Sequence, residues 1–326
     1  MESRGLWETK VTKMLGIQYP IIEGAFGGFG TSALAAPVSE AGGLGIITAN
    51  AFRTPEELRD DIRRMKSLTD KPFGVNLTAM FPNIEAMREV IITEGVPIVE
   101  TAAYRADVHG KYLKEAGLTW IHKVATMKHA LSAEKQGADA IVVVGLEGAG
   151  FKSTIQLPTL IAVPWAVRQL KVPVIAAGGI GDGLGFMAAL AMGAEAVYLG
   201  TAFMATKECP ITDKYKQLLV EGDPTDPKFR DRNLAPPKAT DYDQVMKEKG
   251  KIPHNEWLMK LERVLLKESG DLPTGDIEST AAAEEIFKLA PGSLAVATIH
   301  EVKSVKDLIE GIIGEAETIR RRWALS

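Results

Sequence analysis

The sequence predicts an α/β protein of the (β/α)8 TIM barrel class, with a smaller, mostly helical cap domain inserted near its end. Short runs rich in valine, isoleucine and aromatic residues alternate with amphipathic segments from residue 17 to about 205. Eight such runs exceed the roughly six strands of a doubly wound sheet. The pattern then changes, because eight of the 17 prolines lie from Pro210 to Pro291.

The eight runs are expected to be strands. They cover residues 19–23, 44–48, 73–77, 98–101, 120–123, 140–144, 174–177 and 196–199. Helices are expected between them, as in TPEELRDDIRRMKSL, where Thr54 can cap, Pro55 takes the first helical position, and Leu58, Ile62 and Met65 recur at helical spacing. NIEAMREVIITEG, HGKYLKEAG and TMKHALSAEKQG read in the same way, and SVKDLIEGIIGEAETIRRR is the expected closing helix.

The length of the chain supports two domains. A TIM barrel typically needs about 250 residues, so a chain of 326 residues has a surplus. We assign residues 1–209 and 291–326 to the barrel and residues 210–290 to the cap.

The bulk composition predicts a soluble cytoplasmic protein. No run of 18 apolar residues occurs, and the beginning, MESRGLWETK, lacks the apolar core of a signal peptide. A net charge of −4 does not suggest binding to nucleic acid or to an anionic membrane. The single cysteine, Cys209, can form neither an internal disulfide nor a metal cluster, so no metal is expected.

Glycines follow the seventh and eighth predicted strands. Ala177 leads into Gly178 and Gly179, and Gly200 precedes Thr201. Adjacent glycines let an oxygen-rich ligand approach main-chain N–H groups, and TIM barrels often bind phosphate after these two strands. The alternative is that the glycines only form tight turns.

Several motifs, taken in order, resemble the nitronate monooxygenase family, formerly called 2-nitropropane dioxygenase. They are IIEGAFGG, EAGGLGIITA, KPFGVNLT, IHKVAT, EGAGF, AAGGIGDGLGFMAALAMGAEAVYLGTAF and ATKEC. The resemblance runs from about residue 11 to 209 and more loosely to the end. It implies a (β/α)8 barrel with a smaller helical domain and a non-covalent FMN at the barrel mouth.

The resemblance also implies which residues bind the cofactor. They are Ile22, Glu23, Gly24, Asn76, Lys123 and Ala149 at the flavin ring, and Ala177, Gly178, Gly179, Gly200 and Thr201 near the phosphate. Asn76 would meet polar edges of the ring, and Lys123 would stabilise negative charge on its N1/O2 side. Glu23 stands where the family commonly has an amide.

One family residue is absent. Members that oxidise nitronates carry a histidine where this chain has Phe151, next to Glu147 and Lys152. A positioned acid or base contributes roughly 10² to 10⁴ in rate, so we expect flavin binding but leave nitronate oxidation open. We take Lys123, Glu147 and the Phe151 position as catalytic candidates. Phe151 favours a dry pocket for an acyl group, and Lys152 either attracts an anionic substrate or coenzyme A phosphate or is an ordinary surface lysine.

None of the five histidines is a clear replacement. Strand alternation turns His122 away from Lys123, toward the helix layer. His109 and His129 are expected to be exposed on helices. His254, in the cap segment KIPHNEWL, is the one candidate to reach over the mouth and contact substrate.

The sequence therefore predicts an FMN-dependent oxidoreductase that acts on a small or acyl substrate, with NADH or NADPH as a candidate reductant. The alternative within the enzyme class is an NAD(P)H-dependent reductase of an enoyl thioester or quinone, or the reverse acyl-CoA dehydrogenation. An alternative of another class is a catalytically idle flavin- or phosphate-binding barrel. The expected partners are a small molecule, with a CoA thioester among the candidates, and a second copy of the chain in a homodimer.

Overall fold

Eight parallel strands form the centre of the protein in the computed structural model, which describes residues 5–26, 29–78, 83–102, 106, 109–150, 153, 155–234, 244–248, 250–251 and 292–323. The strands are β1 (Ile21–Glu23), β2 (Gly45–Thr48), β3 (Phe73–Thr78), β4 (Ile98–Ala102), β5 (Thr119–Val124), β6 (Ala140–Val144), β7 (Val174–Ala177) and β8 (Ala196–Leu199). Their order in the sheet is β1-β8-β7-β6-β5-β4-β3-β2. All eight predicted strands are confirmed, with bounds that differ by at most two residues.

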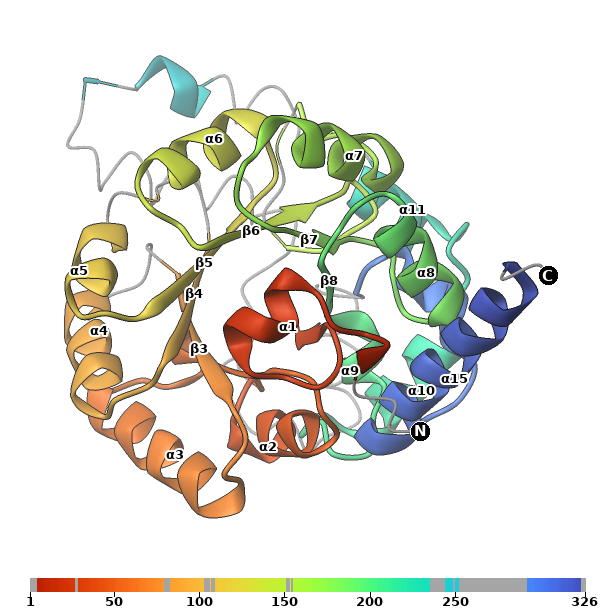
Figure 1. Ribbon diagram of the computed structural model, residues 1–326, viewed down its shortest axis with the longest axis horizontal. Helices are drawn as coiled ribbons and strands as arrows, with labels where there is room; N and C mark the ends of the chain where they lie inside the picture. The colour runs from red at the N-terminus through yellow and green to blue at the C-terminus, as the bar shows by residue number, and fades with distance from the viewer. Residues whose placement is uncertain are drawn as a thin grey trace.

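Most of the helices surround the sheet as a ring (Figure 1). The helices are α1 (Lys10–Leu15), α2 (Ser32–Glu40), α3 (Pro55–Leu68), α4 (Ile84–Thr93), α5 (Gly110–Glu115), α6 (Met127–Lys135), α7 (Thr159–Gln169), α8 (Gly183–Ala191), α9 (Thr201–Met204), α10 (Asp213–Val220), α11 (Pro227–Leu234) and α15 (Val305–Trp323). Two 3-10 helices, η2 (Ala49–Ala51) and η4 (Leu294–Thr298), complete the described elements. The predicted (β/α)8 barrel is confirmed.

Helix α3 shows how the local sequence sets an element. The Thr54 hydroxyl accepts a hydrogen bond from the Glu57 N–H, and Pro55 takes the first helical position. Leu58, Ile62 and Met65 are fully buried against the barrel wall. The helix therefore begins, turns and packs as its sequence predicts.

Side chains alternate strictly along the strands. One set packs outward against the helices, and the other fills the barrel interior with Ile22, Leu44, Ile46, Ile98, Ile121, Ala140, Val142, Ile175, Ala177, Ala196 and Tyr198. Val11 and Leu15 of α1, with Ile17 after it, join the interior set. Helix α1 therefore closes the amino end of the barrel, where it lies across the centre in Figure 1.

Strands β1 and β2 close the barrel through few contacts. One bridge joins Ile22 to Leu44, with hydrogen bonds from Glu23 N to Leu44 O and from Leu44 N to Ile21 O. The Glu23 carboxyl group adds a third, accepting from the Ile46 N–H at 3.0 Å. At the join between β1 and β2, the Glu23 side chain thus makes a contact of the kind that main-chain groups make between the other strands.

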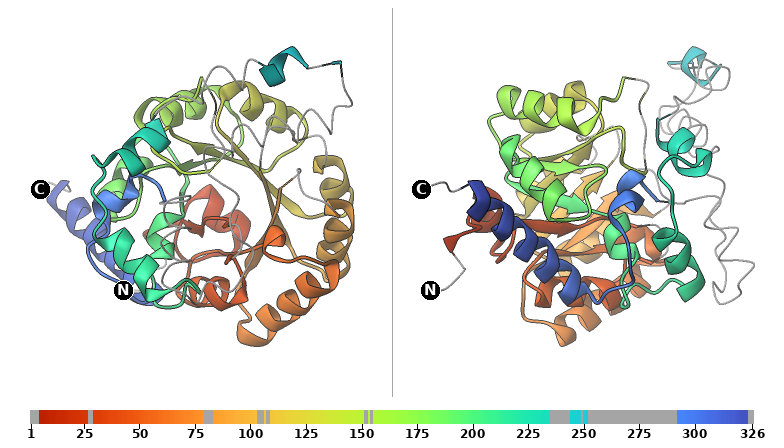
Figure 2. Two further views of the ribbon diagram at one scale, coloured as in Figure 1. Left: turned by 180° about the vertical axis from the view of Figure 1, so that it is seen from behind. Right: turned by 90° about the vertical axis from the view of Figure 1, so that its right-hand side faces the viewer.

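Helices α10 and α11 lie at the end of the barrel opposite α1 (Figure 2). Helices α10 and α11 belong to the predicted cap, whereas residues 235–243 and 252–291 lie outside the described residues. The boundaries 210 and 290 therefore stay a prediction. Among the described residues, no helix has the length and apolar character needed to span a membrane.

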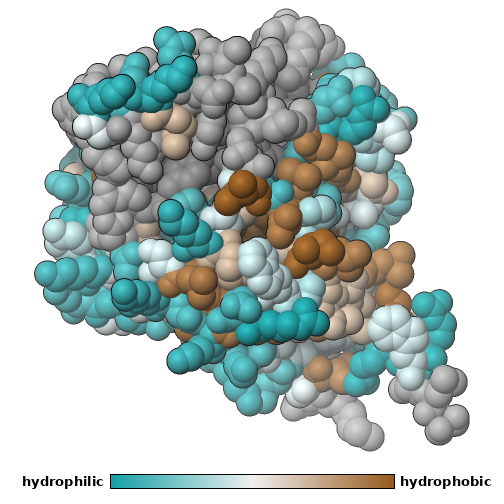
Figure 3. Space-filling view, turned by 90° about the horizontal axis from the view of Figure 1, so that it is seen from above, coloured by the Kyte–Doolittle hydropathy of each residue, from teal (hydrophilic) through white to brown (hydrophobic). Residues whose placement is uncertain are grey.

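Large apolar side chains are exposed on and beside α7 (Figure 3). Leu160, Ile161 and Trp165 are 69%, 53% and 44% exposed, and neighbouring Ile155 and Leu184 are 69% and 57% exposed. Clustered apolar surface of this kind is typical of contacts with another protein. The homodimer stays a prediction.

Replacing Leu15 by alanine should destabilise the barrel, because this side chain is 3% exposed and helps to fill the amino end of the interior. We expect a loss of about 3 kcal/mol in the free energy of unfolding, as for other buried leucines. Urea denaturation measures it. The same change at the exposed Leu160 should cost less than about 0.5 kcal/mol, and equal effects at both sites would contradict the packing role of α1.

Candidate functional site

The barrel interior changes from apolar to polar at the carboxyl end of the strands. Asn76 of β3, Glu100 of β4 and Lys123 of β5 share the inward face with Tyr198 of β8. Asn76 and Glu100 are each 1% exposed, and Tyr198 is 7% exposed. We call these four residues the polar layer. In this barrel class, chemistry takes place at this end of the strands.

Direct contacts join the members of the polar layer. Asn76 Nδ2 donates to Glu100 Oε2, and Lys123 Nζ donates to Tyr198 Oη at 3.2 Å. Glu100 Oε1 lies 3.9 Å from Lys123 Nζ. Asn76 and Lys123 were predicted from the sequence, whereas Glu100 and Tyr198 were not. Strand register could have identified them, because Glu100 lies two residues after the inward-facing Ile98 and Tyr198 lies two residues after the inward-facing Ala196.

The Tyr198 hydroxyl lies at the centre of the layer. It accepts from the Ala25 N–H at 2.7 Å and donates to Glu100 Oε2 at 3.5 Å. Burial, and then the neighbouring Glu100 carboxylate, raise the pKa of Tyr198 well above its ordinary value. Tyr198 is therefore a neutral phenol at physiological pH.

The glycines after β7 form a tight cradle. Gly178 and Gly179 have φ angles of 108° and 72°, values that side chains disfavour. A Cβ on Gly178 would lie 3.0 Å from Gly145 N, and one on Gly179 would lie 3.0 Å from the Glu147 Cβ. Neither position has room for a side chain, so both residues present main chain without a Cβ, as a phosphate site at main-chain N–H groups requires.

The loop after β8 completes the cradle. A Cβ on Gly24 would lie 2.8 Å from Gly200 Cα, so the ends of β1 and β8 touch through their backbones. Thr201, the first residue of α9, pairs its hydroxyl with that of Ser293 at 2.8 Å and accepts from Ser293 N at 2.9 Å. Its hydroxyl thus has a protein partner, which leaves its main-chain N–H as the donor directed by the helix start.

The Glu147 carboxylate holds the start of α7. Its oxygens accept from Thr159 N at 2.9 Å and from Thr159 Oγ1 at 2.8 Å, and the same hydroxyl lies 3.0 Å from Gly178 O. Through Thr159, Glu147 therefore stabilises the backbone at Gly178, on one side of the cradle. Its predicted catalytic role stays a prediction.

Glu23 and Ile22 lie on opposite sides of the barrel wall. Ile22 faces the interior, whereas the fully buried Glu23 carboxyl group contacts Ile46 N across the join between β1 and β2. Burial raises the pKa of Glu23 well above its ordinary value, which favours its neutral form. Glu23 and Ile22 thus shape the wall beside Gly24, and their flavin contacts stay predictions.

Three predicted substrate residues, Phe151, Lys152 and His254, lie outside the described residues. Ala149 is described and exposed, on the loop between β6 and α7. Ala177 ends β7, buried at 3% exposure, and its carbonyl accepts from Gly145 N at 2.8 Å. The structure therefore brings the cradle and the polar layer together at one end of the barrel.

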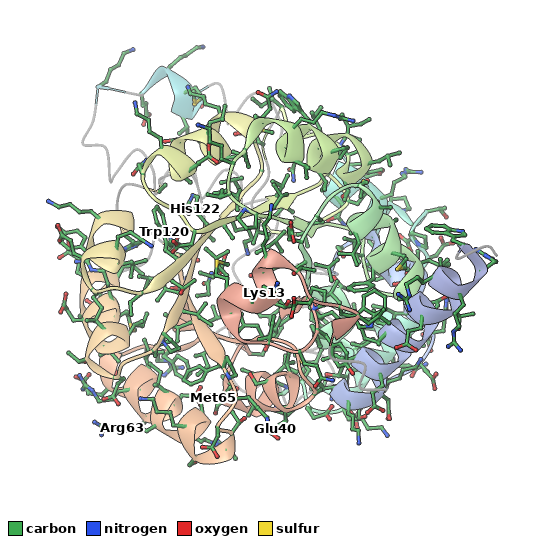
Figure 4. All side chains as sticks on the ribbon, viewed as in Figure 1. Lys13, Glu40, Arg63, Met65, Trp120 and His122 are labelled. Carbon is green, nitrogen blue, oxygen red and sulfur yellow. The ribbon has the colours of Figure 1, made fainter. Side chains whose placement is uncertain are left out.

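His122 points away from the polar layer, as predicted. With Trp120 it lies between β5 and the surrounding helices (Figure 4). Thr101 Oγ1 accepts from Trp120 Nε1 and is hydrogen-bonded to His122 Nδ1, both at 2.7 Å. His122 Nε2 has no hydrogen-bond partner among the described residues. Burial first, and then nearby His129 and His109, lower the pKa of His122 to about 3.

The prediction that His109 and His129 are exposed is wrong. His109 is 1% exposed and packs 3.4 Å from Arg88 Nη1, so burial lowers its pKa to about 4. His129 is half-buried, with its ring 2.9 Å from Thr126 Oγ1. His109 is the N-cap of α5 and His129 lies in the first turn of α6, and the sequence periodicity did not show that these positions are covered.

A TIM barrel with a glycine cradle beside a polar layer defines the class of barrels that bind a phosphorylated ligand at the carboxyl ends of their strands. The chain belongs to the nitronate monooxygenase family, whose model matches residues 8–315. The resemblance stated from the motifs is confirmed. The family is one of FMN-dependent oxidoreductases.

Individual relatives carry different names. The (3aS,4S,5R,7aS)-5-hydroxy-7a-methyl-1-oxo-octahydro-1H-indene-4-carboxyl-CoA dehydrogenase of Rhodococcus jostii is 38% identical over 209 residues, or 64% of this chain and 58% of the relative. The chain thus matches less than two thirds of that relative's length. A probable nitronate monooxygenase of Staphylococcus aureus is 32% identical over 68% of this chain and 75% of its own length. The structure of FabK from Thermotoga maritima has a TM-score of 0.75 and 34% identity, over 97% of this chain and 98% of that one.

Acid should destabilise the protein through His122. Its folded pKa of about 3 lies below the ordinary value of 6.5, so from pH 6.5 downward the unfolded chain binds a proton that the folded chain does not. The contribution of His122 to the free energy of unfolding is complete above pH 6.5 and falls as the pH drops, by about 3 kcal/mol at pH 4.5. Urea denaturation at pH 4.5 and above pH 6.5 measures this loss, and the free energy of unfolding should fall less between these conditions in His122→Gln than in the wild type. His300→Gln, at an exposed site, is the control, and an unchanged loss in His122→Gln would contradict the assignment.

Proposed function

We propose that this protein is an FMN-dependent oxidoreductase that binds its cofactor at the carboxyl end of the barrel. The observation that carries the proposal is the cradle of Gly178, Gly179 and Gly200 beside the polar layer with Lys123. A phosphate fits main-chain N–H groups that no Cβ covers. A flavin ring fits next to a cation and an amide that can meet its polar edges.

The residues present give each part of the cofactor a partner. Lys123 would stabilise negative charge on the N1/O2 side of the ring, with its side chain 19% exposed at the mouth. Asn76 already donates to Glu100 and accepts from Thr78 at 3.1 Å, so its second N–H is the group left for a ligand. FMN supplies the exchange of hydride or electrons with the substrate.

The substrate candidates are a nitronate and an acyl thioester. Family membership favours the first, whereas Phe151 at the family's histidine position removes the usual acid or base. Similarity to a CoA dehydrogenase, together with similarity to FabK, favours the second, and an apolar Phe151 suits an acyl group. We therefore propose acyl thioester reduction or dehydrogenation as the second candidate function, with NADH or NADPH as the reductant in the reductive direction.

Gly200→Ala should weaken FMN binding without disturbing the fold. Among the described residues, a Cβ at this position would meet only Phe26 Cε1, at 3.7 Å, so the protein accommodates it, but the methyl group would cover the cradle. Loss of one charge-assisted hydrogen bond predicts at least about tenfold weaker affinity. Titration of the cofactor-free protein, followed by the flavin absorbance bands, measures it.

Gly314→Ala is the matched control. A Cβ on Gly314, in α15, meets no atom of the described residues within 4 Å, so FMN affinity should equal that of the wild type. Wild-type protein that takes up no FMN would refute the proposal and favour a barrel for another phosphorylated ligand. Bound FMN that neither NADH, NADPH nor an acyl substrate reduces anaerobically would favour an idle flavin-binding protein.

Phe151→His should increase nitronate oxidation. We expect slow turnover of propionate 3-nitronate by the wild type and a rise of about 10²-fold in the variant, because a positioned base contributes 10² to 10⁴. Steady-state rates with the nitronate and with an enoyl-CoA measure it, and Phe151→Leu is the control. Rapid nitronate turnover by the wild type would show that Phe151 does not limit this reaction.

A further inference from the structure

Glu100 is a carboxylate enclosed in the barrel interior. Its side chain is 1% exposed, and its neighbour two residues earlier on the inward face is Ile98. Oε2 accepts from Asn76 and Tyr198, whereas Oε1 has no hydrogen-bond partner among the described residues. Burying a carboxylate is costly unless a charge compensates it. The Lys123 ammonium, 3.9 Å from Oε1, supplies that charge.

The Lys123 ammonium has partners on one side. It donates to Tyr198 Oη at 3.2 Å and lies 4.8 Å from the centre of the Tyr198 ring. Glu100 flanks it from the neighbouring strand, as β4 pairs Ala102 with Lys123. An ammonium group has three N–H donors. One is directed at Tyr198, and Glu100 Oε1 lies at ion-pair distance without accepting a hydrogen bond, so at least one donor is available at the barrel mouth.

We propose that Glu100 and Tyr198 are positioning residues that hold the Lys123 ammonium at the mouth, and that the Glu100 carboxylate offsets its charge and so lowers the electron affinity of a flavin bound there. This inference rests on the proposed flavin site and deepens it, because it names what sets the electric field at the ring. Neither residue needs to touch the cofactor for this effect.

Other titratable groups near this pair add little charge. Glu23, in β1, is buried with its pKa raised, and His122, beside Lys123 on β5, is buried with its pKa lowered to about 3. Tyr198 is held as the phenol. All three are neutral near pH 7. The field at the mouth therefore depends on the balance between Lys123 and Glu100.

The first test uses the cofactor-free protein. In protein labelled with ¹⁵N-lysine, NMR detects amine groups whose hydrogens exchange slowly with water, and Lys123→Met assigns the signal. We expect Glu100→Gln and Tyr198→Phe each to speed exchange at Lys123 at least about tenfold, since each removes a charge-assisted contact. Glu115→Gln, which breaks the exposed 3.8 Å pair with Lys111, is the control. Unchanged exchange in both test variants would overturn the positioning role.

The second test is the midpoint potential of bound FMN. Glu100→Gln removes the offsetting charge, so the potential should become more positive, and Glu100→Asp should return it toward the wild-type value. Glu115→Gln should leave it unchanged. A potential that stays the same or falls in Glu100→Gln would overturn the charge-balance role. If Glu100→Gln does not fold, Glu100→Asp should shift the potential by a smaller amount in the same direction, and Tyr198→Phe carries the exchange measurement.

The two proposals fail in different ways. Wild-type protein without affinity for FMN would refute the proposed function, and the lysine exchange would still decide whether Glu100 and Tyr198 hold Lys123. Bound FMN with unaltered exchange and potential in the variants would refute only the further inference.

Discussion

Closure of the sheet is the constraint on which the rest of the structure depends. A parallel sheet left open exposes a row of unpaired N–H and C=O groups, and here the weakest join is between β1 and β2. Two main-chain hydrogen bonds and the Glu23 carboxyl group close it. Only a closed barrel separates an interior face from a helix-covered face, and that separation gives Lys123 and His122, adjacent on β5, opposite environments.

Closure of the sheet also brings polar side chains together at one end of the barrel interior. Inside the barrel, apolar side chains fill the positions toward the amino end, and Asn76, Glu100, Lys123 and Tyr198 take inward positions closer to the carboxyl end. Buried polar groups persist when they pair with one another, and these four are joined by hydrogen bonds and an ion pair across β3, β4, β5 and β8. The glycine loops after β7 and β8 border the same layer. A cation held by buried partners therefore lies beside backbone that a phosphate can approach.

The sequence predicted most of the fold because each barrel unit carries its own signals. Caps such as Thr54 and β-branched runs are local, and they placed all eight strands. The site was predicted where glycine or a motif marks it, as at Gly178, Gly179, Asn76 and Lys123. Glu100 was missed because an acid inside an apolar run has no local signature, and its partners come from strands that lie 24 to 98 residues away. His109 was misassigned for the same reason, since its burial depends on Arg88 from the preceding helix.

Helix α1 blocks the amino end of the barrel. Val11, Leu15 and Ile17 occupy the amino end of the interior, so any molecule that reaches Lys123 must enter and leave on the cap side. Two reactants that both need the same few atoms at this entrance would have to bind there one after the other. Such one-sided access favours an order of events in which the first product departs before the second reactant arrives.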